Sequence, residues 1–160
     1  MRTMRRIEGS ANGQGLRVCV IDTSWNEMIV ERLAKGALGQ LRKLGVADEA
    51  ITHVTVAGAF ELPVAAKAAA ESGRFDAVVC LGCVIRGATP HFDYVAGEAA
   101  KGIAKVALDT GLPVAFGVLT TETVEQAMDR AGVKLGNKGA EAAVVAVETA
   151  NTLRELRTEA

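Results

Sequence analysis

The chain has 160 residues, of which 18 are basic and 19 acidic, so its formal net charge is −1. This length suits a single domain, and the near-neutral charge argues against a nucleic-acid partner or an anionic membrane surface. No apolar run approaches the roughly 20 residues that a membrane-spanning helix requires. The basic residues near the start are not followed by the apolar segment of a signal peptide, so we expect a cytoplasmic protein.

The first third of the chain begins with residues 1–15, a basic, polar and glycine-containing segment that we expect to be a flexible arm. An apolar run then predicts a strand over residues 16–21. Ser24 and Glu27 have the spacing of a capping box. Apolar residues recur after them at helical spacing, which predicts a helix that ends near Gly45.

The middle third contains two more predicted strands. Residues 51–57 form a partly polar strand, which favours an edge position in a sheet. An alanine-rich helix follows and ends near Gly73. Residues 77–85 form a nine-residue apolar run with several β-branched side chains, which predicts a strand buried on both faces. A helix then extends to about Asp109.

The last third adds a strand predicted over residues 114–119. Residues 120–122 (Thr-Thr-Glu) are expected to cap a short helix that ends near Ala131. Residues 132–139 are glycine-rich and predict a loop, and residues 140–157 form an amphipathic pattern typical of a terminal helix.

This alternation of strands and helices predicts one α/β domain over residues 16–160. We expect a three-layer sandwich, in which helices flank a four-stranded parallel sheet joined by right-handed crossovers. The first and third strands are the most apolar, which places them in the centre of the sheet. The expected strand order is therefore 2-1-3-4, as in flavodoxin-like folds.

The stretch after the third predicted strand contains the most groups that can bind or react with a ligand. Thr89 and Pro90 predict a helix start, with the threonine as cap and the proline at the first helical position. Backbone N–H groups at such a position form a seat for phosphate. His91 beside it can exchange protons near neutral pH. We assign Arg86 no role.

Residues that follow the other strands point to the same edge of the sheet. Trp25 and Asn26 follow the first strand, and Phe60 and Glu61 follow the second. Ligands bind at the carboxyl edge of open parallel sheets, so this asymmetry predicts a binding site there. Trp25 fits either a half-buried anchor or a platform on which a flat heterocycle stacks. Glu61 fits either a ligand contact or a charge that complements a helix dipole.

Other sequence patterns argue against nucleotide, metal and redox sites. The chain has no G-x-G-x-x-G motif and no Walker lysine, which argues against dinucleotides and nucleoside triphosphates. Cys80 and Cys83 form a C-x-x-C, but positions three apart in a strand face opposite sides, so we expect buried thiols rather than a metal or redox pair. No metal or cofactor is expected. His53, inside a predicted strand, is interpreted as structural.

The chain resembles the 6,7-dimethyl-8-ribityllumazine synthase family of riboflavin biosynthesis. The resemblance extends from about residue 16 through nearly the whole chain, and its most specific part is the long run after the third strand. The matching motifs are residues 24–26 (SWN), 58–63 (GAFELP), 82–95 (GCVIRGATPHFDYV), 116–120 (FGVLT), 129–132 (DRAG) and 137–139 (NKG).

The resemblance implies a transferase that needs no cofactor. Such enzymes condense 5-amino-6-ribitylaminouracil with 3,4-dihydroxy-2-butanone 4-phosphate and release phosphate and water. Phe116 and Arg130 would come from the neighbouring subunit. The resemblance assigns substrate contacts to Trp25, Asn26, Ala59, Phe60, Glu61, Cys83, Val84, Ile85, Phe116 and Lys138, phosphate contacts to Ala88, Thr89 and Arg130, and proton transfer to His91.

The resemblance also implies a homo-oligomer with active sites shared between subunits. Family members form pentamers, and the short loop over residues 135–138 is similar to that of members that build icosahedral shells. Riboflavin synthase is a candidate partner. Two alternatives remain open: a riboflavin synthase of the archaeal type, and a shell or storage protein that binds lumazine or flavin without catalysis.

Overall fold

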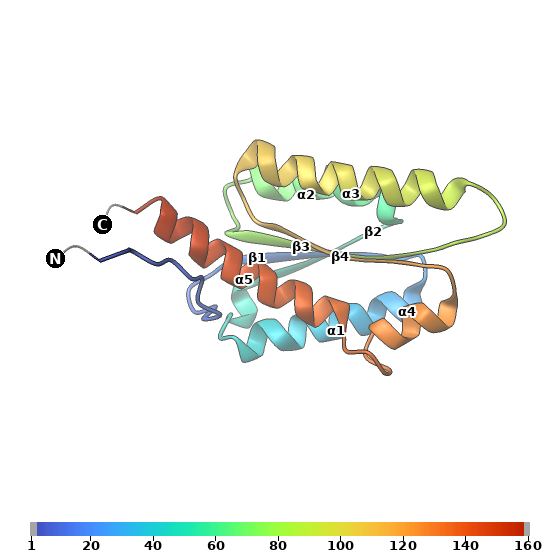
Figure 1. Ribbon diagram of the computed structural model, residues 1–160, viewed down its shortest axis with the longest axis horizontal. Coiled ribbons are helices and arrows are strands. Elements are labelled where there is room, and N and C mark those ends of the chain that lie inside the picture. Colours follow the sequence, from blue (N-terminus) through green and yellow to red (C-terminus); the bar gives the residue numbers. More distant parts are fainter. Residues whose placement is uncertain (1–2, 159–160) are drawn as a thin grey trace.

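A computed structural model describes residues 3–158 and shows an α/β sandwich of three layers (Figure 1). Its four strands are β1 (Val18–Thr23), β2 (Ile51–Val56), β3 (Ala77–Ile85) and β4 (Val114–Thr121). All pair in parallel in the order β2-β1-β3-β4, which confirms the predicted fold and strand order.

Five α-helices cover the two faces of the sheet. Helices α2 (Leu62–Glu71) and α3 (His91–Thr110) lie on one face. Helices α1 (Glu27–Lys43), α4 (Val124–Arg130) and α5 (Lys138–Leu156) lie on the other (Figure 1). Short 3₁₀ turns, η1 (Asp48–Ala50) and η2 (Ala59–Glu61), flank β2. Among residues 3–158, no helix combines the length and the apolar character needed to cross a membrane.

The central strands are the most buried parts of the molecule. Every residue of β1 is buried, and so is every residue of β3 except its last, Ile85. Cys83 packs in the core layer toward α1 and α5, whereas Cys80 packs in the layer toward α2 and α3. The C-x-x-C pair therefore faces opposite sides of the sheet, as predicted. Burial raises the pKa of Cys80 to about 12 and that of Cys83 to about 11.

Two predicted helix starts are wrong by one or more residues. The N-cap of α1 is Asn26, in a left-handed conformation with φ of 60°, and the predicted Ser24–Glu27 capping box does not form. Helix α3 begins at His91, after Pro90, and the Thr89 side chain does not cap it.

The last two helices also start at other residues than predicted. Thr120 and Thr121 belong to β4, and Thr123 is the cap of α4, since its hydroxyl accepts a hydrogen bond from the N–H of Gln126 at 3.1 Å. Helix α5 begins two residues earlier than predicted, because the side chain of Asn137 accepts from the N–H of Ala140 at 3.0 Å.

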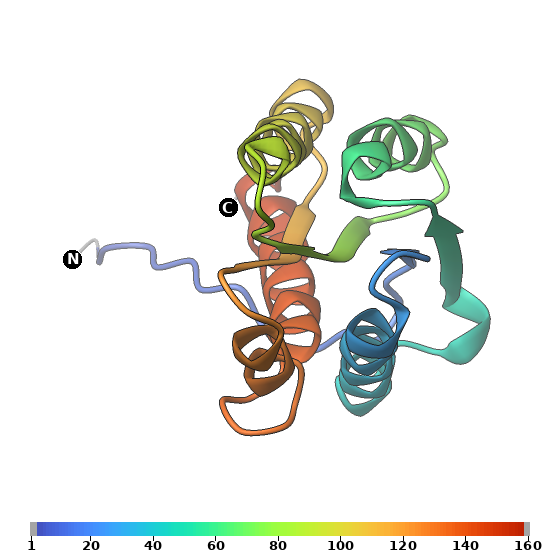
Figure 2. The ribbon, with the colours of Figure 1, turned by 90° about the vertical axis from the view of Figure 1, so that its right-hand side faces the viewer.

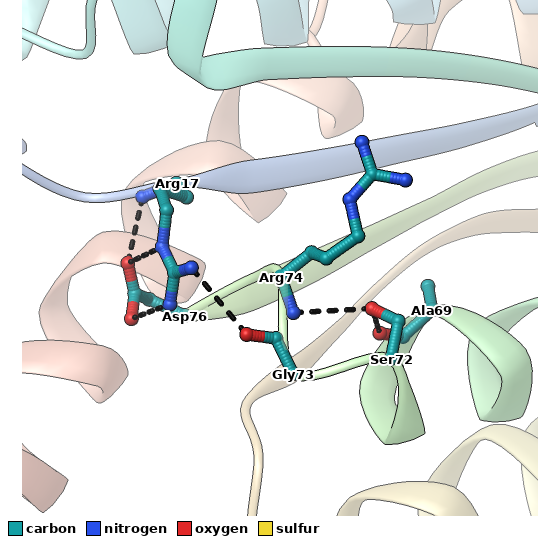
Figure 3. A network of polar contacts seen from close by, with 6 residues as sticks. All are labelled: Arg17, Ala69, Ser72, Gly73, Arg74 and Asp76. Atoms are coloured by element: carbon teal, nitrogen blue, oxygen red, sulfur yellow. Dashed lines mark hydrogen bonds and ion pairs between the residues drawn. The ribbon is translucent and has the colours of Figure 1, made fainter.

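Polar contacts fix the amino-terminal edge of the sheet, which is opposite the edge predicted to bind a ligand (Figure 3). The N–H of Arg17 donates to the Asp76 carboxylate at 2.8 Å, and the Asp76 N–H donates to the Arg17 carbonyl at the same distance. The Arg17 guanidinium also pairs with the Asp76 carboxylate and donates to the Gly73 carbonyl. These contacts align the starts of β1 and β3 far from the predicted site.

Part of the predicted arm lies along α5. The side-chain amide of Asn151 donates to the carbonyls of Ser10 at 2.7 Å and Asn12 at 2.9 Å. The first two residues of the predicted arm and the last two of the predicted domain, residues 159–160, lie outside the described residues.

Candidate functional site

The carboxyl edge of the sheet holds a cavity of about 470 Å³, here called the apolar cavity. Figure 2 views this edge end-on, where the loops after the strands turn toward the helices. The ends of β1, β2 and β3 and the first turns of α3 build the cavity. Its lining residues are Thr23, Trp25, Asn26, Gly58, Ala59, Phe60, Glu61, Cys83, Val84, Ile85, His91, Tyr94 and Val95.

Trp25 is packed on one side and open on the other. The N–H of Ser24 donates to the Val56 carbonyl at 2.8 Å, and that of Trp25 donates to the Ala57 carbonyl at 3.0 Å. The indole lies against Gly58 so closely that a Cβ there would clash with the ring. Because 64% of Trp25 is still exposed, a flat ligand can reach its free surface, which favours the platform over the half-buried anchor.

Asn26 links the first loop to the third strand. Its left-handed backbone is a conformation that asparagine tolerates better than most residues. Its side-chain amide donates to the Cys83 carbonyl at 2.9 Å. The Cys83 thiol is buried, so this residue contributes to the edge of the cavity mainly through its backbone.

Glu61 shapes the second loop. Its carboxylate accepts a hydrogen bond from the N–H of Gly58 at 3.0 Å and closes the turn η2. The turn buries Ala59 and leaves Phe60 57% exposed at the cavity. Glu61 therefore holds its own loop in place and is also one of the residues that line the cavity.

Arg86 ties the third loop to its surroundings. Its guanidinium pairs with the carboxylate of Glu122 at 2.8 Å and that of Asp93 at 3.3 Å, and lies 4.4 Å from the centre of the Phe92 ring. The hydrogen bond to Glu122 raises the pKa of Arg86 above its ordinary value. Arg86, to which the sequence pattern gave no role, thus anchors the loop that leads to His91.

The rest of that loop is exposed. Ala88 and Thr89 lie between the end of β3 and the start of α3, outside the lining of the apolar cavity. His91, the first residue of α3, lies on the cavity. The predicted phosphate seat therefore borders the predicted proton-transfer residue along the chain and is exposed.

The remaining predicted residues surround a second cavity, of about 580 Å³, here called the polar cavity. It is built by β4, α4, the following loop and the start of α5. Phe116, Arg130 and Lys138 all line it. Within residues 3–158, neither Arg130 nor Lys138 forms an ion pair with a carboxylate. Both cations are therefore available to an anion.

The structure thus divides the predicted residues other than Ala88 and Thr89 into two groups. The two cavities share no lining residue. The apolar cavity also includes Tyr94 and Val95, which sequence reasoning missed. Both lie one helical turn after His91, so the three- and four-residue spacing of a helix could have revealed them.

A comparison with known families agrees with this arrangement. The family model of 6,7-dimethyl-8-ribityllumazine synthase matches residues 15–154. The matched region includes all four strands, both cavities and nearly all of α5. Since the match covers far more than half of the chain, the protein belongs to the 6,7-dimethyl-8-ribityllumazine synthase family.

Proposed function

We propose that the protein condenses 5-amino-6-ribitylaminouracil with 3,4-dihydroxy-2-butanone 4-phosphate to form 6,7-dimethyl-8-ribityllumazine, a step of riboflavin biosynthesis. The family match carries this proposal. The separation of a ring-sized apolar cavity from a cavity with two available cations supports it, because one substrate is a flat heterocycle and the other a phosphate ester.

In this proposal the apolar cavity takes the pyrimidine. Trp25 stacks on the ring, and the backbone groups of residues 83–85 bind its polar edge. Asn26 fixes this backbone through its bond to the Cys83 carbonyl. Ala59, Phe60 and Glu61 hold the ribityl chain, whose hydroxyl groups suit a carboxylate acceptor.

The phosphate binds between the loop after β3 and the polar cavity. The N–H groups of Ala88 and Thr89 bind its oxygens, and Arg130 pairs with the dianion, with Lys138 nearby. Phe116 covers the side of the site that holds the pyrimidine ring. These contacts also stabilise the charge that develops when phosphate leaves.

The reaction begins when the 5-amino group of the pyrimidine attacks the ketone and water leaves to give an imine. Phosphate is then eliminated, and the ribitylamino nitrogen closes the second ring with loss of another water. His91 moves protons at these steps, since it lies on the cavity where the two substrates meet. Holding both substrates together lowers the barrier further, because amines and ketones already condense without a catalyst.

We propose that the protein acts as a ring of copies. The two cavities share no lining residue, so pairing one with the other on a neighbour gives a head-to-tail interface, and such an interface forms a ring when its rotation closes. Exposed apolar residues border both, with Phe60 and Tyr94 at the apolar cavity and Leu135 at the polar one. The family resemblance suggests five copies and further packing into an icosahedral shell, which light scattering would detect as a species larger than a pentamer.

The direct test mixes the purified protein with both substrates and records lumazine absorbance together with phosphate release. We expect the two products in equal amounts. A protein that binds the lumazine but forms none would be a storage or shell protein instead. A second reaction that contains lumazine alone tests the remaining alternative, since appearance of riboflavin would indicate a riboflavin synthase.

A further inference from the structure

A buried carboxylate, Asp22, lies near the end of β1 and lines a separate cavity of about 310 Å³ together with residues of α1 and β2. The side chain of Asp22 is only 9% exposed. One of its oxygens lies 2.7 Å from Nε2 of His53, and the other accepts from the hydroxyl of Thr55 at 2.6 Å. A buried carboxylate is costly unless both oxygens are satisfied, so these two contacts keep Asp22 in place.

The contacts join β1 to one of the two edge strands of the sheet. Strand β2 is at the edge of the sheet and pairs only with β1. Asp22 lies directly opposite Thr55 in the register of the two strands, and His53 lies two residues earlier on the same face of β2. The side chain of Asp22 therefore adds two cross-strand bonds at the last rungs of the ladder.

The two loops of the apolar cavity begin immediately after these rungs. One loop carries Trp25, whose N–H donates to the Ala57 carbonyl and whose ring lies on Gly58. The other loop carries Phe60. The position of the indole relative to the second loop is thus set by how closely the ends of β1 and β2 are held.

We propose that Asp22, through His53 and Thr55, is a positioning residue that holds the Trp25 indole against Gly58 and so sets the width of the apolar cavity. The identity of the ring that enters the cavity rests on the proposed function, whereas the geometry of the indole does not. The contact acts on the half of the site that binds the heterocycle and leaves the phosphate half unchanged.

The test uses Thr55→Val, which removes one hydroxyl and keeps the shape of the side chain. Thr52→Val is the matched control, because Thr52 is in the same strand and lies opposite Cys19, on the other face of β2. His53→Val removes the second contact. With 39% of its side chain exposed, His53 can be replaced without leaving a cavity in the core. This variant therefore tests the proposal if Thr55→Val does not fold.

The first readout is acrylamide quenching of tryptophan emission, which reports on Trp25 alone because the chain has a single tryptophan. We expect quenching to rise in Thr55→Val and His53→Val by up to about one half, since loss of a hydrogen bond frees the loop end and Trp25 is already 64% exposed, and to stay unchanged in Thr52→Val. Equal quenching in Thr55→Val and Thr52→Val would overturn the proposal, whether or not the protein forms lumazine.

The second readout separates positioning from plain stabilisation. We expect the KM for the pyrimidine to rise about fivefold in Thr55→Val, while the KM for the phosphate ester stays constant. A variant that unfolds at a lower temperature but keeps both KM values and the quenching of the wild type would show a purely structural contact and refute the proposal. If the wild type itself forms no lumazine, the proposed function fails and the quenching readout alone decides.

Discussion

The apolar and polar cavities of this protein lie at neighbouring strand ends but are lined by different kinds of residues. The apolar cavity combines aromatic surface and backbone groups from the ends of three strands, held by Asn26, Glu61 and Arg86. The polar cavity places Arg130 and Lys138 beside β4 without carboxylate partners in residues 3–158. In the proposed reaction the first cavity takes the ring and the second supplies cations for the phosphate, so each is half of the proposed site.

The largest effect is expected when the anion half loses its main charge. Arg130→Ala should lower kcat/KM for the phosphate ester about 100-fold, because a charge-assisted pair with a dianion is lost. The KM for the pyrimidine should change little. Lys134→Ala is the control, since Lys134 is an exposed cation on the loop that follows α4. Equal losses in both variants would mean that Arg130 acts only through general charge.

Replacement of the proton-transfer residue should have a smaller effect. His91→Ala is expected to lower the single-turnover rate about 30-fold, because general acid–base help is removed while both substrates remain bound. Binding of either substrate should be nearly unchanged. An unaltered single-turnover rate would show that His91 does not move protons in the reaction.

Loss of the stacking surface should weaken binding of the pyrimidine ring more than it lowers the rate of the chemical steps. Trp25→Ala is expected to raise the KM for the pyrimidine about tenfold, since stacking of a base on an aromatic side chain is worth about 1–3 kcal/mol. Trp25→Phe should keep most of the affinity. Titration of the pyrimidine against both variants would measure this, and similar affinities for Ala and Phe would argue against stacking.

The smallest effect is expected at Cys83. Its carbonyl accepts from Asn26, while burial raises the pKa of its thiol to about 11. Cys83→Ala should therefore keep kcat and both KM values within about twofold. Iodoacetamide should not inactivate the protein at pH 7.5, and inactivation should begin only as the pH approaches the raised pKa, where the thiolate forms. Rapid inactivation at neutral pH would show an accessible, reactive thiol.

The sheet was predictable because its strands differ strongly in polarity. The apolar runs of β1 and β3 indicate central positions, and the polar residues of β2 indicate the edge. Helix starts were less predictable. At α1 the left-handed Asn26 takes the cap position from Ser24, and it does so because its side chain reaches the Cys83 carbonyl of a distant strand.

The site was predictable only in part, for a related reason. Loops that follow parallel strands meet at one edge, which brought Trp25, Phe60 and His91 together as expected. The contact between Asp22 and His53 was not foreseen, since it depends on the register between β1 and β2. Register is decided by packing across the whole sheet rather than by local sequence.

The most direct test of the account mixes two variants that damage different halves. His91→Ala leaves the polar cavity intact, and Arg130→Ala leaves the apolar cavity intact. If each site combines the apolar cavity of one copy with the polar cavity of the next, oligomers reassembled from equal amounts of the two variants regain both groups in about a quarter of their sites. We expect about a quarter of the wild-type activity. An activity no higher than the mean of the two separate variants would contradict a site shared between copies.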